Sequence, residues 1–149
     1  KGSILQVVST TKTDTASTTT SGSWTDISGL SVTITPSSTS SKIIILVTIG
    51  SVSSSGGASV GFLLRRGDIR VGNSTSETKQ SGIGNAYAGS QDYLQTIATN
   101  FLDSPNTTSA TTYKMQWRNS GSTSYLGQYT GNTTEYNGSS TITVMEIAV

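Results

Sequence analysis

Hydrophobic and polar residues alternate with a period of two along several short segments of the chain. In residues 30–35, Leu, Val and Ile alternate with Ser and Thr, and in residues 113–118, Tyr, Met and Trp alternate with Lys, Gln and Arg. This period places one set of side chains on each face of an extended strand. The pattern therefore predicts half-buried β-strands whose outer faces carry mainly hydroxyl and other polar groups.

Similar segments recur along the chain, separated by turns rich in Gly, Ser, Asn and Pro. Many short strands without an amphipathic helix are typical of a sandwich or barrel. The sequence predicts one all-β domain over residues 1–149, a jelly-roll-like antiparallel β-sandwich of about eight to ten strands, with an immunoglobulin-like sandwich as the alternative. We expect polar loops over 13–23 and 73–90, and strands over 4–12, 24–27, 30–35, 42–51, 60–66, 69–72, 93–102, 111–119, 123–129 and 140–147.

Residues 43–49 are apolar at every position except Thr48. A run of this kind indicates apolar contacts on both faces of the strand. The hydrophobic content of the chain, 32%, is low for a globular domain, while a net charge of +1 is too small to favour disorder. We therefore expect the domain to bury further surface against copies of itself. The predicted subunit interface consists of Ile43, Ile45, Val47 and Ile49.

Charged residues are sparse, at 11% of the chain, and balanced in sign. A nucleic-acid-binding domain normally carries a basic patch or stripe. The nearest candidate here is Arg65, Arg66 and Arg70, and the adjacent pair would point to opposite faces of a strand. No apolar stretch approaches the roughly 18–20 residues that span a bilayer. The sequence therefore predicts neither a nucleic-acid partner nor membrane insertion.

Candidate catalytic groups are few, because the chain contains no His and no Cys. Carboxylates remain, and a glycosidase holds two of them about 5–9.5 Å apart. No motif brings Asp92 or Asp103 together with Glu135. We expect no enzymatic activity, no catalytic residues, no cofactor and no metal, with a glycan-cleaving spike domain as the remaining enzymatic alternative.

Aromatic and amide side chains gather late in the chain. Tyrosine faces stack on sugar rings and amides hydrogen bond to sugar hydroxyls. The competing and favoured interpretation is that Tyr125 and Tyr129 belong to a core or interface and that residues 132–138 form a hairpin loop. The Arg-Gly-Asp tripeptide at 66–68 is interpreted as a hairpin turn. The candidate glycan-binding residues are Tyr125, Gln128, Tyr129, Asn132, Tyr136 and Asn137.

Five blocks of sequence occur in order along the chain. They are GSILQVV at 2–8, GLSVTITP at 29–36 with SSKI at 40–43, FLLR at 62–65 with the glycines at 67 and 72, LDSP at 102–105 with TTY at 111–113, and ITVMEI at 142–147. Together they resemble a module of virion proteins of tailed bacteriophages, especially marine and cyanobacterial phages, where it often ends tail-fibre-like proteins. Residues 73–90 and 125–138 fall outside the resemblance.

The resemblance implies an all-β, jelly-roll-like and trimeric domain on the virion exterior, without catalytic residues. The expected function is that of a tail-fibre or spike domain that attaches to the host surface, with a capsid decoration protein as the alternative. Its expected partners are copies of itself, other phage structural proteins, and a host-surface glycan or protein. The two stretches outside the resemblance, 73–90 and 125–138, are suited as loops to recognition of the host surface. Because residue 1 is Lys, we expect the sequence to be a piece or a processed form of a longer protein.

Overall fold

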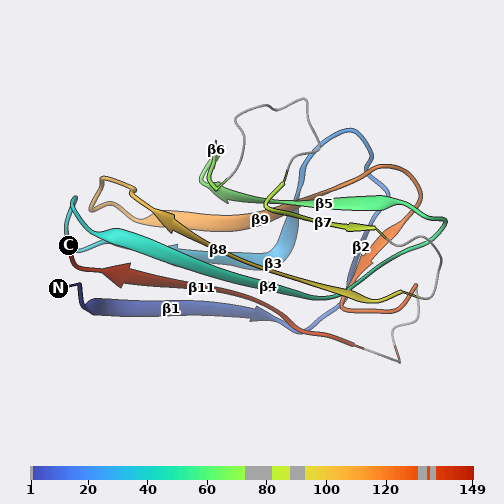
Figure 1. Cartoon of the computed structure of the whole chain (residues 1–149), viewed down its shortest axis with the longest axis horizontal. Coiled ribbons are helices and arrows are strands. Elements are labelled where there is room, and N and C mark those ends of the chain that lie inside the picture. The colour runs from blue at the N-terminus through green and yellow to red at the C-terminus, as the bar shows by residue number, and fades with distance from the viewer. Residues whose placement is uncertain (1, 73–81, 88–92, 131–133, 135–136) are drawn as a thin grey trace.

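The computed structural model describes residues 2–72, 82–87, 93–130, 134 and 137–149, which form two antiparallel β-sheets packed face to face (Figure 1). None of these residues lies in a helix long and apolar enough to cross a membrane. The strands are β1 (Ile4–Lys12), β2 (Ala16–Thr18), β3 (Thr25–Ile34), β4 (Lys42–Ser54), β5 (Ser59–Arg66), β6 (Ile69–Arg70), β7 (Gly84–Tyr87), β8 (Gln95–Asp103), β9 (Thr111–Asn119), β10 (Ser124–Leu126) and β11 (Ser140–Ile147).

The principal strands pair in a nested order. β1 pairs with β11, β3 with β9, β4 with β8, and β5 with β7, as if one long hairpin had been rolled up. Rolling produces one sheet in the order β1-β11-β4-β8 and a second in the order β3-β9-β5-β7, while β2, β6 and β10 are short additions. This arrangement is a jelly roll. The predicted all-β jelly-roll-like sandwich is therefore confirmed.

Strand β4 changes neighbours along its length. It pairs with β11 up to Thr48 and with β10 from Val52 onward. Between them, Ser51 has a φ of 50° and the register toward β8 shifts. Gly50 lies so close to the incoming chain that a Cβ there would stand 2.5 Å from the Ser139 carbonyl oxygen. The bulge thus lets one long strand serve two partners on the same edge.

Several predicted boundaries differ from the structure, and three of the differences change the set of strands. The expected strands 24–27 and 30–35 are one strand, β3, because a register shift between Asp26 and Ser31 and a φ of 79° at Gly29 absorb the irregularity. The predicted loop 13–23 contains β2, which pairs with β10, and the predicted loop 73–90 contains β7. Residues 73–81 and 88–92 lie outside the described residues. These short strands have few apolar residues, so their pairing partners decide them rather than their own pattern.

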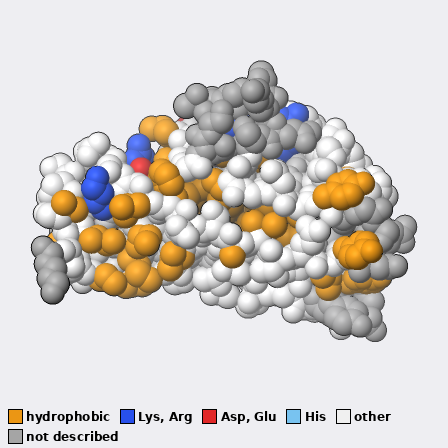
Figure 2. Space-filling model, viewed as in Figure 1, with side chains coloured by type: hydrophobic (Ala, Val, Ile, Leu, Met, Phe, Trp, Pro, Cys, Tyr) orange, Lys and Arg blue, Asp and Glu red, His pale blue; other side chains and the backbone are white. Residues whose placement is uncertain are grey.

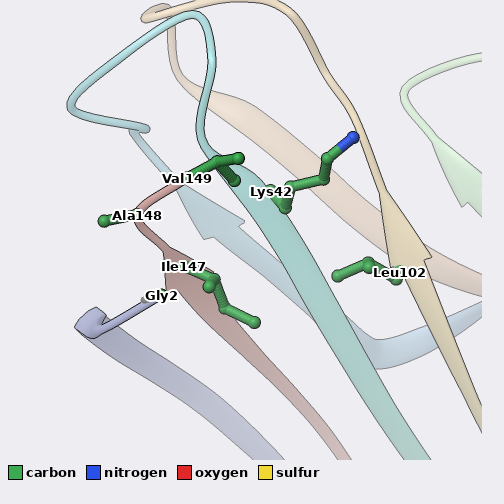
Figure 3. Close-up of a pocket in the computed structure, with 6 residues that line it drawn as sticks. All are labelled: Gly2, Lys42, Leu102, Ile147, Ala148 and Val149. Atoms are coloured by element: carbon green, nitrogen blue, oxygen red, sulfur yellow. The ribbon is translucent and has the colours of Figure 1, made fainter.

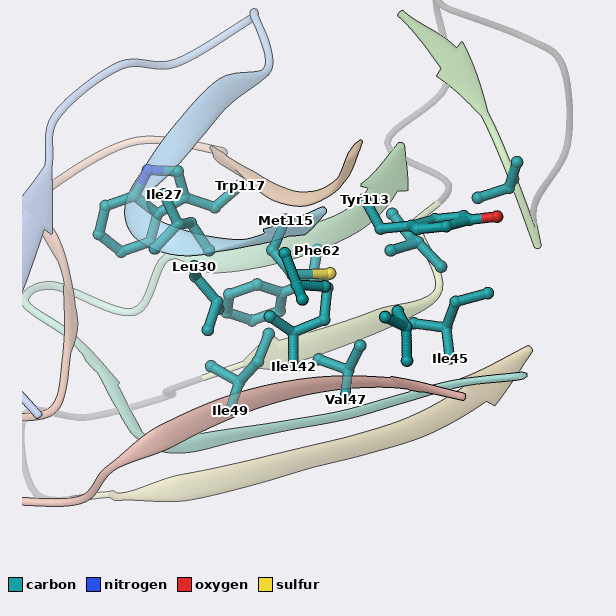
Figure 4. Close-up of a cluster of buried hydrophobic side chains, with 14 of the residues drawn as sticks. Ile27, Leu30, Ile45, Val47, Ile49, Phe62, Tyr113, Met115, Trp117 and Ile142 are labelled. Carbon is teal, nitrogen blue, oxygen red and sulfur yellow. The ribbon is translucent and has the colours of Figure 1, made fainter. Parts of the chain in front are cut away.

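The hydrophobic core lies between the two sheets (Figure 4). Inward residues of β4 face inward residues of β5 and β9, including the fully buried Phe62 and Met115. The structure corrects the predicted subunit interface, because all four of its residues lie in this core and are at most 2% exposed: Ile43, Ile45, Val47 and Ile49. Period-two alternation sends the other residues of β4 outward, so a surface for a neighbour would lie there instead.

Candidate functional site

The outer face of the β1-β11-β4-β8 sheet carries an exposed apolar surface. We call a row of paired residues that runs across the strands a rank. The central rank of this surface crosses all four strands, because Val7 pairs with Met145, Met145 with Ile44, and Ile44 with Leu102. Beside this rank lie Ile4 paired with Ile147 on one side and Leu46 on the other. These seven residues are named the outer apolar patch: Ile4, Val7, Ile44, Leu46, Leu102, Met145 and Ile147.

The outer apolar patch occupies one half of its sheet face, and the other half is mostly polar. In the next two ranks, Ser9 pairs with Thr143 and Thr11 with Thr141. Figure 2 shows hydrophobic side chains gathered at the lower left, over the strand ends nearest to the termini. Such a gathering on a soluble domain marks an interaction surface more often than isolated apolar side chains do.

A shallow hollow of about 340 Å³ adjoins the outer apolar patch. It is lined by Gly2, Lys42, Leu102, Ile147, Ala148 and Val149. Figure 3 shows Ile147 and Leu102 on either side of β4, with Val149 and Lys42 at the rim. The Lys42 ammonium group donates a hydrogen bond to Ser104 Oγ at 2.7 Å, so its charge is held away from the patch.

The outer face of the opposite sheet is charged. Asp26 Oδ2 lies 3.0 Å from Lys114 Nζ, and Asp26 Oδ1 accepts a hydrogen bond from Gln116 at 2.6 Å. Gln116 in turn accepts one from Arg65 Nε at 2.6 Å. This chain of contacts crosses β3, β9 and β5 and satisfies its own polar groups, as an exterior face does. The two outer faces therefore differ sharply in chemistry.

The predicted glycan-binding residues are not all at the surface. Tyr125, on β10, and Tyr129 are partly exposed and Asn137 is exposed, but Gln128 is buried. The cause is Ser53, whose Oγ donates to the Gln128 carbonyl and accepts from the Thr130 amide, both at 3.0 Å, and so holds the segment against β4. Gln128 is thereby removed from the candidate site. Asn132 and Tyr136 lie outside the described residues.

Asp103, a carboxylate considered for catalysis, is part of a structural cluster. Its Oδ2 accepts hydrogen bonds from Arg66 Nη1 and from the Tyr113 hydroxyl, each at 2.7 Å. Burial and the bond to Asp103 raise the pKa of the Tyr113 phenol above its ordinary value, so it remains the donor. The cluster ties β8 to β5 and β9 across the sandwich. Arg65 and Arg66 do point to opposite faces, as predicted.

The Asp103 cluster makes a stability prediction. Tyr113→Phe removes a buried hydrogen bond to a charged acceptor and should lower the free energy of unfolding by about 1.5 kcal/mol in urea titrations. Tyr93→Phe, at an exposed position, is the matched control and should change it by less than about 0.5 kcal/mol. Equal losses for the two substitutions would show that the hydrogen bond from Tyr113 to Asp103 does not contribute to the free energy of unfolding.

No catalytic or metal constellation involving the other acidic residues is apparent in the described part of the chain. Glu146 is buried and engaged by Gln6 and Ser37, while Asp92 and Glu135 lie outside the described residues. Within the described ranges, no group of three or more acidic, His or Cys side chains is placed to hold a metal ion.

Sequence reasoning missed most of the outer apolar patch, although a signal for it exists. Adjacent apolar pairs occur at 7–8, 44–45, 101–102 and 144–145. An adjacent pair in a strand places one apolar side chain on each face. The register aligns all four pairs, so that one member of each forms the inner rank and the other the outer rank.

Comparison with known proteins finds no matching family model and no matching curated protein. Among solved structures, the chain is similar to one of infectious bursal disease virus, Gt strain, with 11% identity and a TM-score of 0.43 over 95% of this chain and 40% of the viral chain. A Gx-strain structure gives 13% identity and a TM-score of 0.41 over 99% and 38%. A VP2 subviral particle of this virus gives 13% and 0.36 over 95% and 39%. The chain spans about two fifths of the viral chains it matches.

Proposed function

We propose that this chain is a virion structural protein of a tailed bacteriophage, a tail-fibre or spike domain on the particle exterior that attaches to host-surface glycan. The observation that carries the proposal is the separation of its two candidate surfaces along the long axis. The outer apolar patch lies over the strand ends nearest to the termini (Figure 2), whereas β10 pairs with the far end of β4, at residues 52–54 (Figure 1). One end is suited to assembly with other subunits and the other to contact with the host surface.

The blocks that carry the phage resemblance support the proposal. They fall on seven of the eight strands that form the jelly roll, which are β1, β3, β4, β5, β8, β9 and β11. The stretch at 125–138, outside the resemblance, begins on β10. A constant scaffold with an independent loop surface is a common arrangement for recognition.

The proposed mechanism is avidity. Partly exposed Tyr125 and Tyr129 and exposed Asn137 offer stacking faces and an amide to sugar hydroxyls. Contacts of this kind are weak one at a time. Joining several copies in a trimer, and several trimers on a particle, raises the effective affinity by about 10²–10⁴ without new contacts.

Binding of the purified 149-residue chain to an array of bacterial lipopolysaccharides and capsular polysaccharides tests this function. We expect selective binding, weakened at least tenfold by Tyr129→Ala combined with Asn137→Ala. The control is Asn106→Gly, which removes an amide at the other end of the molecule, where a φ of 53° suits glycine. Binding to empty phage heads with none to glycans or cells would overturn the proposal in favour of capsid decoration.

A further inference from the structure

The outer apolar patch has a composition unlike that of an ordinary exterior. Lys42 is the one charged residue among the outward positions of β1, β11, β4 and β8, and its ammonium group is bonded to Ser104. Depletion of charge at the centre with polar groups around it is characteristic of protein interfaces. The opposite sheet face, with Asp26, Arg65 and Lys114, has the composition of a surface that stays in water.

The size of the face indicates a macromolecular occupant. Strands about 4.8 Å apart and outward ranks about 6.8 Å apart give four strands by four ranks a flat area of roughly 500 Å², before side-chain relief is added. A stable interface buries about 800 Å² of accessible surface on each partner. The whole sheet face, its polar half included, approaches that size, so its partner must be flat and equally extended.

We propose that the outer apolar patch is covered by a second copy of this chain, sheet face against sheet face. A nearly uncharged face meets an identical face without like-charge repulsion, whereas it offers no complement to a charged partner. Facing sheets pack about 10 Å apart through interdigitating side chains. The hollow between Ile147 and Leu102 can receive an apolar side chain from the other copy.

This inference deepens the proposed attachment function, on which it rests for its purpose, by naming the assembly surface. It also places the corrected interface on the outward residues of β4. Patch on patch, the two copies form a dimer about a twofold axis, and the trimer of the proposed function would need a second contact outside the patch. β10, with Tyr125, pairs with the other end of β4 and so stays outside the proposed contact.

Solution mass tests the inference. The chain has a mass of 15.5 kDa, and we expect sedimentation or light scattering at micromolar concentration to give at least twice that mass. Leu102→Glu, at a position 53% exposed, should raise the dissociation constant at least tenfold while leaving the circular dichroism spectrum of the folded domain unchanged. Ile69→Glu, at a position 57% exposed on β6, is the matched control and should leave the mass unchanged.

Each result separates the two proposals. A monomeric parent chain, or equal loss of assembly in both variants, would overturn the self-association surface. Should Leu102→Glu prove insoluble, Val7→Glu at the other end of the same rank provides a second variant with the same expected loss of assembly. An assembled protein that binds no glycan would overturn the attachment function and leave the surface standing.

Discussion

Ile45→Asp is expected to abolish folding, whereas Leu46→Asp, one residue away, is expected to leave the domain folded. Ile45 is fully buried between the sheets, while Leu46 is 38% exposed on the outer face. A carboxylate at position 45 loses the burial of an isoleucine and places an unpaired charge in the core. Truncation of a buried isoleucine alone costs about 2–5 kcal/mol, against a total stability of about 5–15 kcal/mol for a typical domain.

The measurement is the soluble yield of each variant, followed by urea unfolding of whatever is soluble. Ile45→Asp should be found in the insoluble fraction, and Ile45→Ala should unfold at lower urea with a loss of about 3 kcal/mol. Leu46→Asp should keep a cooperative transition and lose only self-association. A folded monomer from Ile45→Asp would mean that the side chain faces a neighbour, and would restore the interface predicted from sequence.

This pair of residues also shows what the sequence could and could not predict. The apolar run at 43–49, interrupted only by Thr48, correctly indicates a strand with apolar groups on both faces. It does not indicate which face is the core, because Ile43 and Ile44 are chemically identical. The choice depends on β11 and β8, whose inward residues Val144 and Phe101 align with Ile45. The face of β4 that enters the core is therefore decided by the pairing register, which is a property of three strands together.

The loop surface illustrates a different limit. Composition alone selected Gln128 beside Tyr129 as sugar-binding groups. Gln128 is buried because Ser53, some 75 positions away in sequence, holds its carbonyl and the Thr130 amide. A hydroxyl among so many others gives no signal of this role. Long strands with regular alternation, such as 4–12, 111–119 and 140–147, were predicted with their observed boundaries because their own pattern is sufficient.

Glu146→Gln is expected to destabilise the domain strongly at neutral pH and hardly at all near pH 2. Glu146 points inward from β11, and its carboxylate accepts hydrogen bonds from Gln6 Nε2 at 2.5 Å and from the Ser37 amide and hydroxyl at 2.7 and 2.6 Å. Burial by itself would raise the pKa of this carboxyl. The bonds donated by Gln6, Ser37 and Ser41 outweigh burial and lower the pKa from 4.5 to about 2.

The direction of the pH effect follows from that lowered pKa. In the unfolded chain Glu146 takes up its proton near pH 4.5, and in the folded chain only near pH 2. The carboxylate therefore stabilises the fold fully above pH 4.5, and this contribution is lost as the pH falls to about 2. At pH 7 Glu146→Gln should lower the free energy of unfolding by about 2 kcal/mol, the scale of hydrogen bonds to a buried charge.

Urea titrations of the parent chain and Glu146→Gln from pH 7 down to pH 2 measure the difference. The difference in the free energy of unfolding between the parent chain and Glu146→Gln should be constant down to about pH 4.5 and should disappear below it. Asp68→Asn, in the exposed β5–β6 turn, makes the same carboxylate-to-amide change. Its free energy of unfolding should follow that of the parent chain at every pH. A gap that persists at pH 2 would assign the loss to packing. In that case the hydrogen bonds that Gln6 and Ser37 donate to Glu146 would not hold β1 and the turn after β3 against β11.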